Sequence, residues 1–236
     1  MSNYALYFSP DSANVVVRAA LETAGVAYDA HLVDRGAQMQ RSPEYLALNP
    51  QGLLPVLTDG DEVIFETAAI LLHLVDREAG LGPKVRESGR SDLYRWLFYL
   101  SNTVHADLRV VFYTPRYIAT ESNVPDLRAG IRERFFGHLE LIDNELGKHD
   151  GDFLLASGFS VCDLYLAFCS RWFLLYPHDE PKADVARVQR MSNLWRYVLM
   201  MEEHAGVVSA CEAEEIGAPF ITSPSMPNPT SGSVLG

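Results

Sequence analysis

Two neighbouring segments decide the fold, Asn49-Pro-Gln-Gly-Leu-Leu-Pro-Val-Leu57 and Ile64-Phe-Glu-Thr-Ala-Ala-Ile70. Between them lies Asp59-Gly60-Asp61, a hairpin signal, so the flanking apolar runs are predicted to pair as antiparallel strands. A proline that opens a strand cannot donate to the sheet ladder, which assigns Pro55 to an edge, a bulge or a cis peptide bond. Taken without its neighbours, Pro55 would simply shape a turn.

The chain before this hairpin alternates between strand-like and helix-like segments. Tyr4-Ala-Leu-Tyr-Phe8 is a short apolar run that ends in Ser9-Pro10-Asp11-Ser12, a turn and helix-start cluster. A helix is predicted to follow as far as Ala24, and residues 28–33 form a second strand after it. A variable stretch leads to the hairpin, and residues 68–75 then have helical length and composition. Residues 1–80 therefore predict an α/β domain.

The rest of the chain is predicted to be helical. A Gly- and Pro-rich linker at residues 81–89 is followed by apolar residues at three- and four-residue steps from Leu93 to Val111, which indicate one long amphipathic helix. Ser160 and Asp163 have the spacing of a capping box. The other predicted helices are residues 124–146, 193–203 and 207–215, and one that begins at 159–164. We expect an all-helical domain at 90–216 and an extended tail at 217–236.

Composition narrows the classes of partner. The chain has 236 residues, a formal net charge of −12 and no run of basic residues, which disfavours nucleic acids and anionic membranes. No segment approaches the roughly 18 consecutive apolar residues of a membrane span, and the N-terminus has no secretion-signal pattern. Three scattered cysteines without metal-ligand spacing predict neither disulfides nor a metal site. A cytoplasmic protein is expected.

The two segments quoted first carry a family resemblance. The first is similar to the Asn-Pro-x-Gly-x-x-Pro-x-Leu segment of the cytosolic, bacterial-type glutathione transferase superfamily, and the second is similar to that family's acid-plus-small-hydroxyl segment. Trp195 and residues 202–208 resemble its C-terminal helices. The resemblance, closest to the beta, zeta and related serine-type classes, implies a thioredoxin-like domain with a mixed four-stranded sheet, followed by a helical bundle. It also implies a homodimer.

The resemblance implies that glutathione binds beside the hairpin. Pro55 would be a cis proline that turns the Leu54 N–H and C=O outward, where they pair with the extended tripeptide. Thr67 and the first free amides of its helix would bind the γ-glutamyl carboxylate, with Glu66 against the ammonium group. Thr67 could equally be an ordinary helix cap, and capping is compatible with binding.

The thiol of glutathione reacts as a thiolate, so a hydroxyl donor at a helix N-terminus is expected. In a gap-free comparison with the beta class, Ala13 stands at the position of the catalytic cysteine, so that mechanism does not transfer. In the comparison with the zeta class, Ser12 falls on a serine. We favour Ser12 narrowly over Ser9, with the Asn14 amide as a third candidate. Either serine could instead serve only the turn.

The glycine carboxylate of glutathione lacks an expected partner. Residues 1–80 contain no lysine, and the beta-class lysine position corresponds to Gln38, which can donate a hydrogen bond but carries no charge. Arg35 or Arg41 could compensate. We expect weaker affinity for glutathione if neither does.

The long helix after the linker carries a stripe of polar and aromatic side chains. The stripe contains Asn102, His105, Arg109, Phe112, Tyr113 and Arg116. His105 aligns with a histidine that lines the active site in beta-class proteins, and His105, Arg109, Phe112 and Tyr113 would form a second-substrate pocket. The stripe could instead be a solvent-facing surface.

Two functions follow. The first is an enzyme that uses bound glutathione, as co-substrate and without a metal, against a small hydrophobic electrophile. Conjugation, aryl-ether cleavage, dehalogenation and isomerisation all fit, and detoxification is the implied role. The second is a non-catalytic binding or interaction module on the same scaffold, because fold alone does not determine function. Ala13 and Gln38 favour the module, whereas Pro55, Glu66 and Thr67 favour the enzyme.

Overall fold

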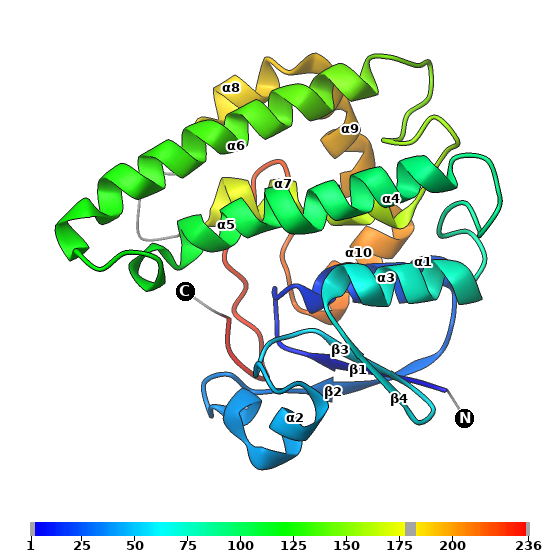
Figure 1. Cartoon of the computed structure of the whole chain (residues 1–236), viewed down its shortest axis with the longest axis vertical. Helices are drawn as coiled ribbons and strands as arrows, with labels where there is room; N and C mark the ends of the chain where they lie inside the picture. Colours follow the sequence, from blue (N-terminus) through cyan, green and yellow to red (C-terminus); the bar gives the residue numbers. More distant parts are fainter. Residues whose placement is uncertain (1–2, 178–182, 235–236) are drawn as a thin grey trace.

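The computed structural model describes residues 3–177 and 183–234, and its N-terminal part is a four-stranded mixed sheet (Figure 1). The strands are β1 (Tyr4–Phe8), β2 (Tyr28–Leu32), β3 (Val56–Asp59) and β4 (Glu62–Phe65). Strand β1 pairs in parallel with β2 and antiparallel with β3, and β3 pairs antiparallel with β4, which gives the order β2-β1-β3-β4. The mixed sheet predicted from the sequence is confirmed.

Helices cover both faces of this sheet (Figure 1). Helices α1 (Asn14–Ala24) and α3 (Thr67–Arg77) pack with Leu6 and Leu57 on the face toward the rest of the chain. Helix α2 (Pro43–Leu48) packs through Tyr45 on the opposite face. The sequence prediction left this stretch without structure and missed α2. Its local signal was Ser42, whose hydroxyl accepts the Tyr45 amide at 3.2 Å and caps the helix.

The remaining described elements are helical, which confirms the predicted fold class. They are α4 (Arg90–Tyr99), α5 (His105–Phe112), α6 (Val124–Leu146), α7 (Val161–Leu175), α8 (Val185–Gln189), α9 (Ser192–Glu202) and α10 (Ala205–Ala213), with 3-10 turns at Thr114–Arg116 and Glu121–Asn123. The sequence prediction missed α8, a helix of only five residues. Among the described residues no helix is both long and apolar enough to cross a lipid bilayer.

The predicted long amphipathic helix is continuous but not uniform. A π-helical segment, Leu100–Val104, joins α4 to α5. Such segments carry an extra residue per turn and are frequent at functional sites. Residues before and after the segment both contribute to the cavity described below.

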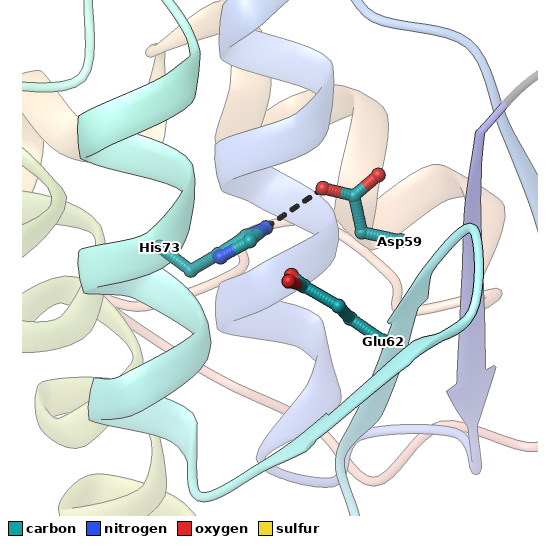
Figure 2. Close-up of side chains that lie close together, drawn as sticks. All are labelled: Asp59, Glu62 and His73. Carbon is teal, nitrogen blue, oxygen red and sulfur yellow. Dashed lines mark hydrogen bonds and ion pairs between the residues drawn. The ribbon is translucent and has the colours of Figure 1, made fainter.

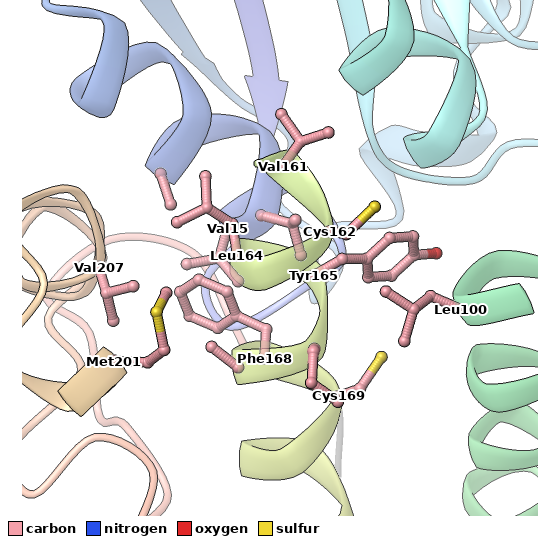
Figure 3. Packing of buried hydrophobic residues seen from close by; sticks show 14 of the residues in the cluster. Val15, Leu100, Val161, Cys162, Leu164, Tyr165, Phe168, Cys169, Met201 and Val207 are labelled. Atoms are coloured by element: carbon pink, nitrogen blue, oxygen red, sulfur yellow. The ribbon is translucent and has the colours of Figure 1, made fainter. Parts of the chain in front are cut away.

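Helix α7 is the centre of the core. All its residues from Val161 to Leu175 are buried, and side chains from α1, the π segment, α9 and α10 surround it (Figure 3). The predicted capping box is present: the Ser160 hydroxyl accepts the Cys162 amide at 3.2 Å, and Asp163 accepts the Ser160 amide at 2.8 Å. The three cysteines are buried and unpaired.

The last described segment, residues 217–234, has no helix or strand but does pack. Ile221 is fully buried, and the amide of Ile221 donates to Glu202 at 2.7 Å. Further along, the Ser233 carbonyl accepts the Ser9 hydroxyl at 3.2 Å. Residues 217–234 run from the helical part of the molecule back to the first turn of the chain (Figure 1).

Candidate functional site

A cavity of about 700 Å³ lies between the α/β part and the helical part of the molecule. Its wall comes from the turn before α1, the loop that leads into β3, the start of α3, the α4–α5 helix and the end of α7. Segments far apart in the sequence therefore form one site. Nine of the twelve predicted site residues line this cavity.

The loop before β3 presents unpaired backbone groups to the cavity. Leu54 and Pro55 line the wall, and the Leu54–Pro55 peptide bond is cis, as the resemblance implied. Among the described residues, no hydrogen bond uses the N–H or C=O of Leu54. Both groups are free to pair with an extended peptide, as a further strand would.

The start of α3 adds a buried hydroxyl and free amides. Thr67 is the first residue of the helix and is buried, and the helix's first amides have no intrahelical acceptor. Glu66, directly before it, adopts φ 75°, which is unusual for a residue with a side chain. The Glu66 carboxylate is exposed and lies 3.5 Å from Gln51 Nε2. This corner offers sites for one carboxylate and one ammonium group.

The turn before α1 brings Ser12 to the cavity. The Ser12 hydroxyl accepts a hydrogen bond from Arg35 Nη1 at 3.0 Å and keeps its own proton free to donate. Arg35 also bonds Tyr113, and burial lowers the pKa of Arg35. A thiolate placed here would meet a hydroxyl donor and a cation together.

The other two candidates for thiol activation do not line the cavity. Ser9 is fully buried, and its hydroxyl donates to the Ser233 carbonyl. The Asn14 side chain accepts the Ser9 amide at 3.0 Å and donates to Glu214 Oε1 at 2.8 Å. Both side chains stabilise the turn, a structural role considered from the sequence for Ser9 but not for Asn14.

Gln38 does not line the cavity either. It is exposed, and its Nε2 donates to the Arg35 carbonyl at 3.0 Å. Of the two arginines considered as substitutes, Arg35 lines the wall, whereas Arg41 lies outside it and donates to the Gln51 carbonyl at 3.4 Å. Gln38 therefore contacts the Arg35 backbone and not the cavity.

The predicted stripe on α5 forms the opposite wall. His105, Arg109, Phe112 and Tyr113 all line the cavity, and so do Asn102 and Arg116. His105 Nδ1 lies 2.8 Å from the Tyr165 hydroxyl, and its ring packs on Trp172 with centroids 5.2 Å apart. Burial, assisted by the nearby Arg109 charge, lowers the pKa of His105 to about 4. His105 is consequently neutral at pH 7.

Sequence reasoning missed the wall contributed by α7. Tyr165, Trp172 and Tyr176 line the cavity, and the Tyr165 hydroxyl bonds both His105 and Thr67. Tyr165 thus links the α3 corner to the α5 wall. The available signal was that Tyr165 and Trp172, two aromatic residues with a polar tip, lie in a largely apolar helix.

The turn that carries Ser12 is held by a buried ion pair. Asp11, at φ 50°, accepts two hydrogen bonds from Arg171, at 3.0 and 2.8 Å, and one each from Trp172 and Tyr176. The Asp11 amide donates to Glu214 at 3.0 Å. These contacts join the first turn of the chain to α7 and to the residue after α10, so the helical part fixes the position of the turn.

A second group of titratable side chains lies away from the cavity. Asp59, Glu62 and His73 hold possible ligand atoms within 4.8 Å of one another (Figure 2). The same carboxylates already receive His73 Nε2 at 3.0 Å and Arg77 at 3.2 and 3.3 Å. We interpret the group as an ion-pair network that attaches α3 to the β3–β4 hairpin.

The chain is similar in sequence to known proteins. Residues 2–76 match the family model described as "Glutathione S-transferase, N-terminal domain". A glutathione S-transferase of Xanthomonas campestris is 24% identical over 169 residues, which cover 71% of this chain and 81% of that protein.

Solved structures agree with the sequence comparison. A beta-class glutathione S-transferase of Sphingomonas chungbukensis has a TM-score of 0.73 at 27% identity, over 89% of this chain and 98% of its own. A glutathione transferase homologue from sulfitobacter, solved with bound glutathione, has a TM-score of 0.76 at 25% identity, over 90% of this chain and 99% of its own.

Proposed function

We propose that bound glutathione attacks a small electrophile in the cavity. The chain belongs to the glutathione transferase superfamily and shares its enzyme class. The observation that carries this proposal is the free Leu54 backbone beside Glu66 and Thr67, in one cavity with Ser12. Four groups that match the parts of one tripeptide face the same space.

Each part of glutathione has a partner in this arrangement. The γ-glutamyl carboxylate binds Thr67 and the free amides at the start of α3, and its ammonium group binds Glu66. The cysteinyl backbone pairs with Leu54 as an added strand. The sulfur then lies at the turn before α1, where Arg35 is also available to a carboxylate of the ligand.

Ser12 is the proposed thiolate donor. A free thiol titrates near ~8.5, and lowering that pKa by about two units requires roughly 2.7 kcal/mol of preferential stabilisation of the anion. A hydrogen bond from Ser12, whose oxygen is already polarised by Arg35, and the N-terminus of α1 supply stabilisation of that order. The thiolate attacks the electrophile, a carbon–sulfur bond forms, and any leaving group departs with its electron pair.

Binding is tested first by calorimetry with millimolar glutathione. We expect measurable heat from the unmodified protein and affinity at least tenfold weaker after Glu66→Gln or Thr67→Val. Glu203→Gln is the matched control, because Glu203 is an exposed acid directly after α9 and does not line the cavity. Absence of heat from the unmodified protein would contradict the whole proposal.

Turnover separates the enzyme from the binding module. A generic chlorinated dinitrobenzene, followed by thioether absorbance, is expected to react with glutathione faster in the presence of the protein. Binding of glutathione without turnover across a panel of aryl chlorides, aryl ethers and isomerisable acids would instead support the module.

We also propose that the enzyme acts as a homodimer, as the family resemblance implies. Light scattering is expected to give about twice the mass of the chain at micromolar concentration.

A further inference from the structure

The cavity concentrates positive charge in an acidic protein. Arg35, Arg109 and Arg116 line its wall, although the chain has 31 acidic and 19 basic residues apart from histidine. The carboxylates among the described lining residues are Asp11 and Glu66. Asp11 is neutralised by Arg171, and Glu66 lies at the α3 corner beside Gln51.

None of these three arginines has a carboxylate partner within the described chain. Arg35 bonds the Ser12 and Tyr113 hydroxyls, and Arg116 lies over the Tyr113 ring at 4.4 Å. Among the described residues, the Arg109 side chain has no hydrogen-bond or ion-pair partner. Several surface arginines elsewhere are paired with carboxylates, as Arg95 is with Asp92 and Glu145.

Glutathione does not account for all of this charge. The γ-glutamyl carboxylate is assigned to the start of α3. Arg35, which lines the same cavity, is available to the glycine carboxylate. Arg109 and Arg116, on α5 and the turn after it, remain for a different anion. Phe112 of α5 and Trp172 of α7 also line the cavity and provide apolar surface.

We propose that the second substrate is an organic acid, an electrophile with an apolar or aromatic body whose carboxylate binds Arg109 and Arg116. This inference rests on the proposed function and narrows its substrate class. Arg109 and Arg116 are exposed at the cavity wall, where a carboxylate accepts charge-assisted hydrogen bonds from both guanidinium groups and an uncharged hydrophobe offers them no charged partner. The acidic protein surface would otherwise repel such a substrate, so the cavity itself must provide the attraction.

Binding is measured without chemistry, with 3,5-dinitrobenzoate and its uncharged twin 3,5-dinitrobenzamide, in the presence of saturating glutathione. We expect the benzoate to bind at least tenfold more tightly and its affinity to fall with added salt. In the Arg109→Gln/Arg116→Gln variant the two compounds are expected to bind alike. Equal binding by the unmodified protein, or an unchanged preference in the variant, would overturn the proposal.

Two further variants control for charge and folding. Arg95→Gln/Arg196→Gln removes the same charge from exposed positions outside the cavity and is expected to keep the preference for the benzoate. Arg109→Lys/Arg116→Lys retains the positive charge and is expected to keep part of that preference. Loss of preference in the Arg95/Arg196 variant would indicate a general charge effect and would also overturn the proposal.

Turnover distinguishes this inference from the proposed function. With 4-chloro-3,5-dinitrobenzoate, the glutathione sulfur bonds to C4 and chloride leaves with the C4–Cl electron pair. If the benzoate is preferred in binding but no chlorinated compound reacts, the enzyme proposal fails and the anion site stands. If a chlorinated acid and its amide react with the same kcat/KM ratio in the unmodified protein and the Arg109→Gln/Arg116→Gln variant, the substrate class is wrong and the enzyme stands.

Discussion

Ser12 and Ser9 are three residues apart, yet their hydroxyls face different surroundings. The Ser12 hydroxyl lies on the cavity wall beside Arg35, and the Ser9 hydroxyl is buried against the Ser233 carbonyl. A serine can donate one proton, and only the proton of Ser12 is left uncommitted. The chemistry proposed for the turn therefore depends on one side chain.

Ser12→Ala is expected to raise the pKa of the bound glutathione thiol by about 1–2 units, because one charge-assisted hydrogen bond of about 1.5–3 kcal/mol is lost. The measurement is a pH titration of thiolate absorbance in the complex, and kcat/KM at neutral pH should fall in parallel. Ser9→Ala is the control and should leave the thiol pKa unchanged. Equal shifts in both variants would contradict the assignment of Ser12.

His105 gives a pH dependence of defined sign. Its pKa is lowered to about 4 in the folded chain, mainly by burial and also by Arg109, against about 6.5 in an unfolded chain. Between these values the unfolded chain binds a proton that the folded chain does not, so this contribution to stability is lost as the pH falls from about 6.5 to 4.

We therefore expect His105→Asn to flatten the decline of the free energy of unfolding over this pH range, relative to the unmodified protein. Urea unfolding at a series of pH values provides the measurement, and the difference between the two proteins cancels the titration of other groups. Exposed His31→Asn is the control. An identical pH slope in the unmodified protein and in His105→Asn would contradict the prediction.

At the scale of elements, helix starts organise both the core and the cavity. The start of α1 holds Ser12, the start of α3 offers Thr67, and the start of α7 is closed by its own capping box. The first two ends leave amides free for a ligand, whereas Ser160 and Asp163 satisfy those of α7 internally. The first two helix starts are the ones proposed to bind glutathione, whereas the third stabilises the core.

Ser160→Ala is expected to lower the free energy of unfolding by about 1–2 kcal/mol, because the cap of the central helix is lost. Chemical denaturation measures this change. Thr120→Ala is the control, since Thr120 precedes a short 3-10 turn without a side-chain capping bond and should change stability little. A loss no larger than that of the control would show that the cap contributes nothing.

At the scale of the molecule, buried polar contacts connect the two parts of the chain. The Asp11–Arg171 pair is fully buried, and Arg171 also donates to the carbonyls of Phe220 at 2.6 Å and Ser225 at 3.0 Å in the terminal segment. One guanidinium group therefore holds the turn before α1, helix α7 and the chain end together. The position of Ser12 depends on this junction.

Asp11→Asn is expected to destabilise the protein by about 3–5 kcal/mol, because the buried Arg171 charge is left without its counter-ion. Denaturant unfolding measures the loss. Combining Asp11→Asn with Arg171→Met removes the unpaired charge and should cost less than the sum of the two single variants. Strict additivity of the single effects would contradict the proposed coupling.

Much of the fold and part of the cavity wall were predictable from the sequence, because their signals are local. The Asp59-Gly60-Asp61 hairpin, the helix at residues 124–146 and the Ser160 capping box depend on contacts a few residues apart, and the structure confirms them. The stripe on α5 was also readable, because side chains three and four residues apart share a helix face.

The remainder depended on which faces meet, and short-range patterns do not contain that information. Nothing local distinguishes Ser12 from Ser9, brings Arg35 to Tyr113, or turns Tyr165 and Trp172 of α7 toward a cavity. Local sequence was enough for most of the elements and for the two segments, residues 49–57 and 64–70, that resemble the family's glutathione-binding motif, since both arise from neighbouring residues. Which hydroxyl reaches the cavity and where its positive charge gathers follow only from the folded chain, because both depend on contacts between segments that are tens of residues or more apart in the sequence.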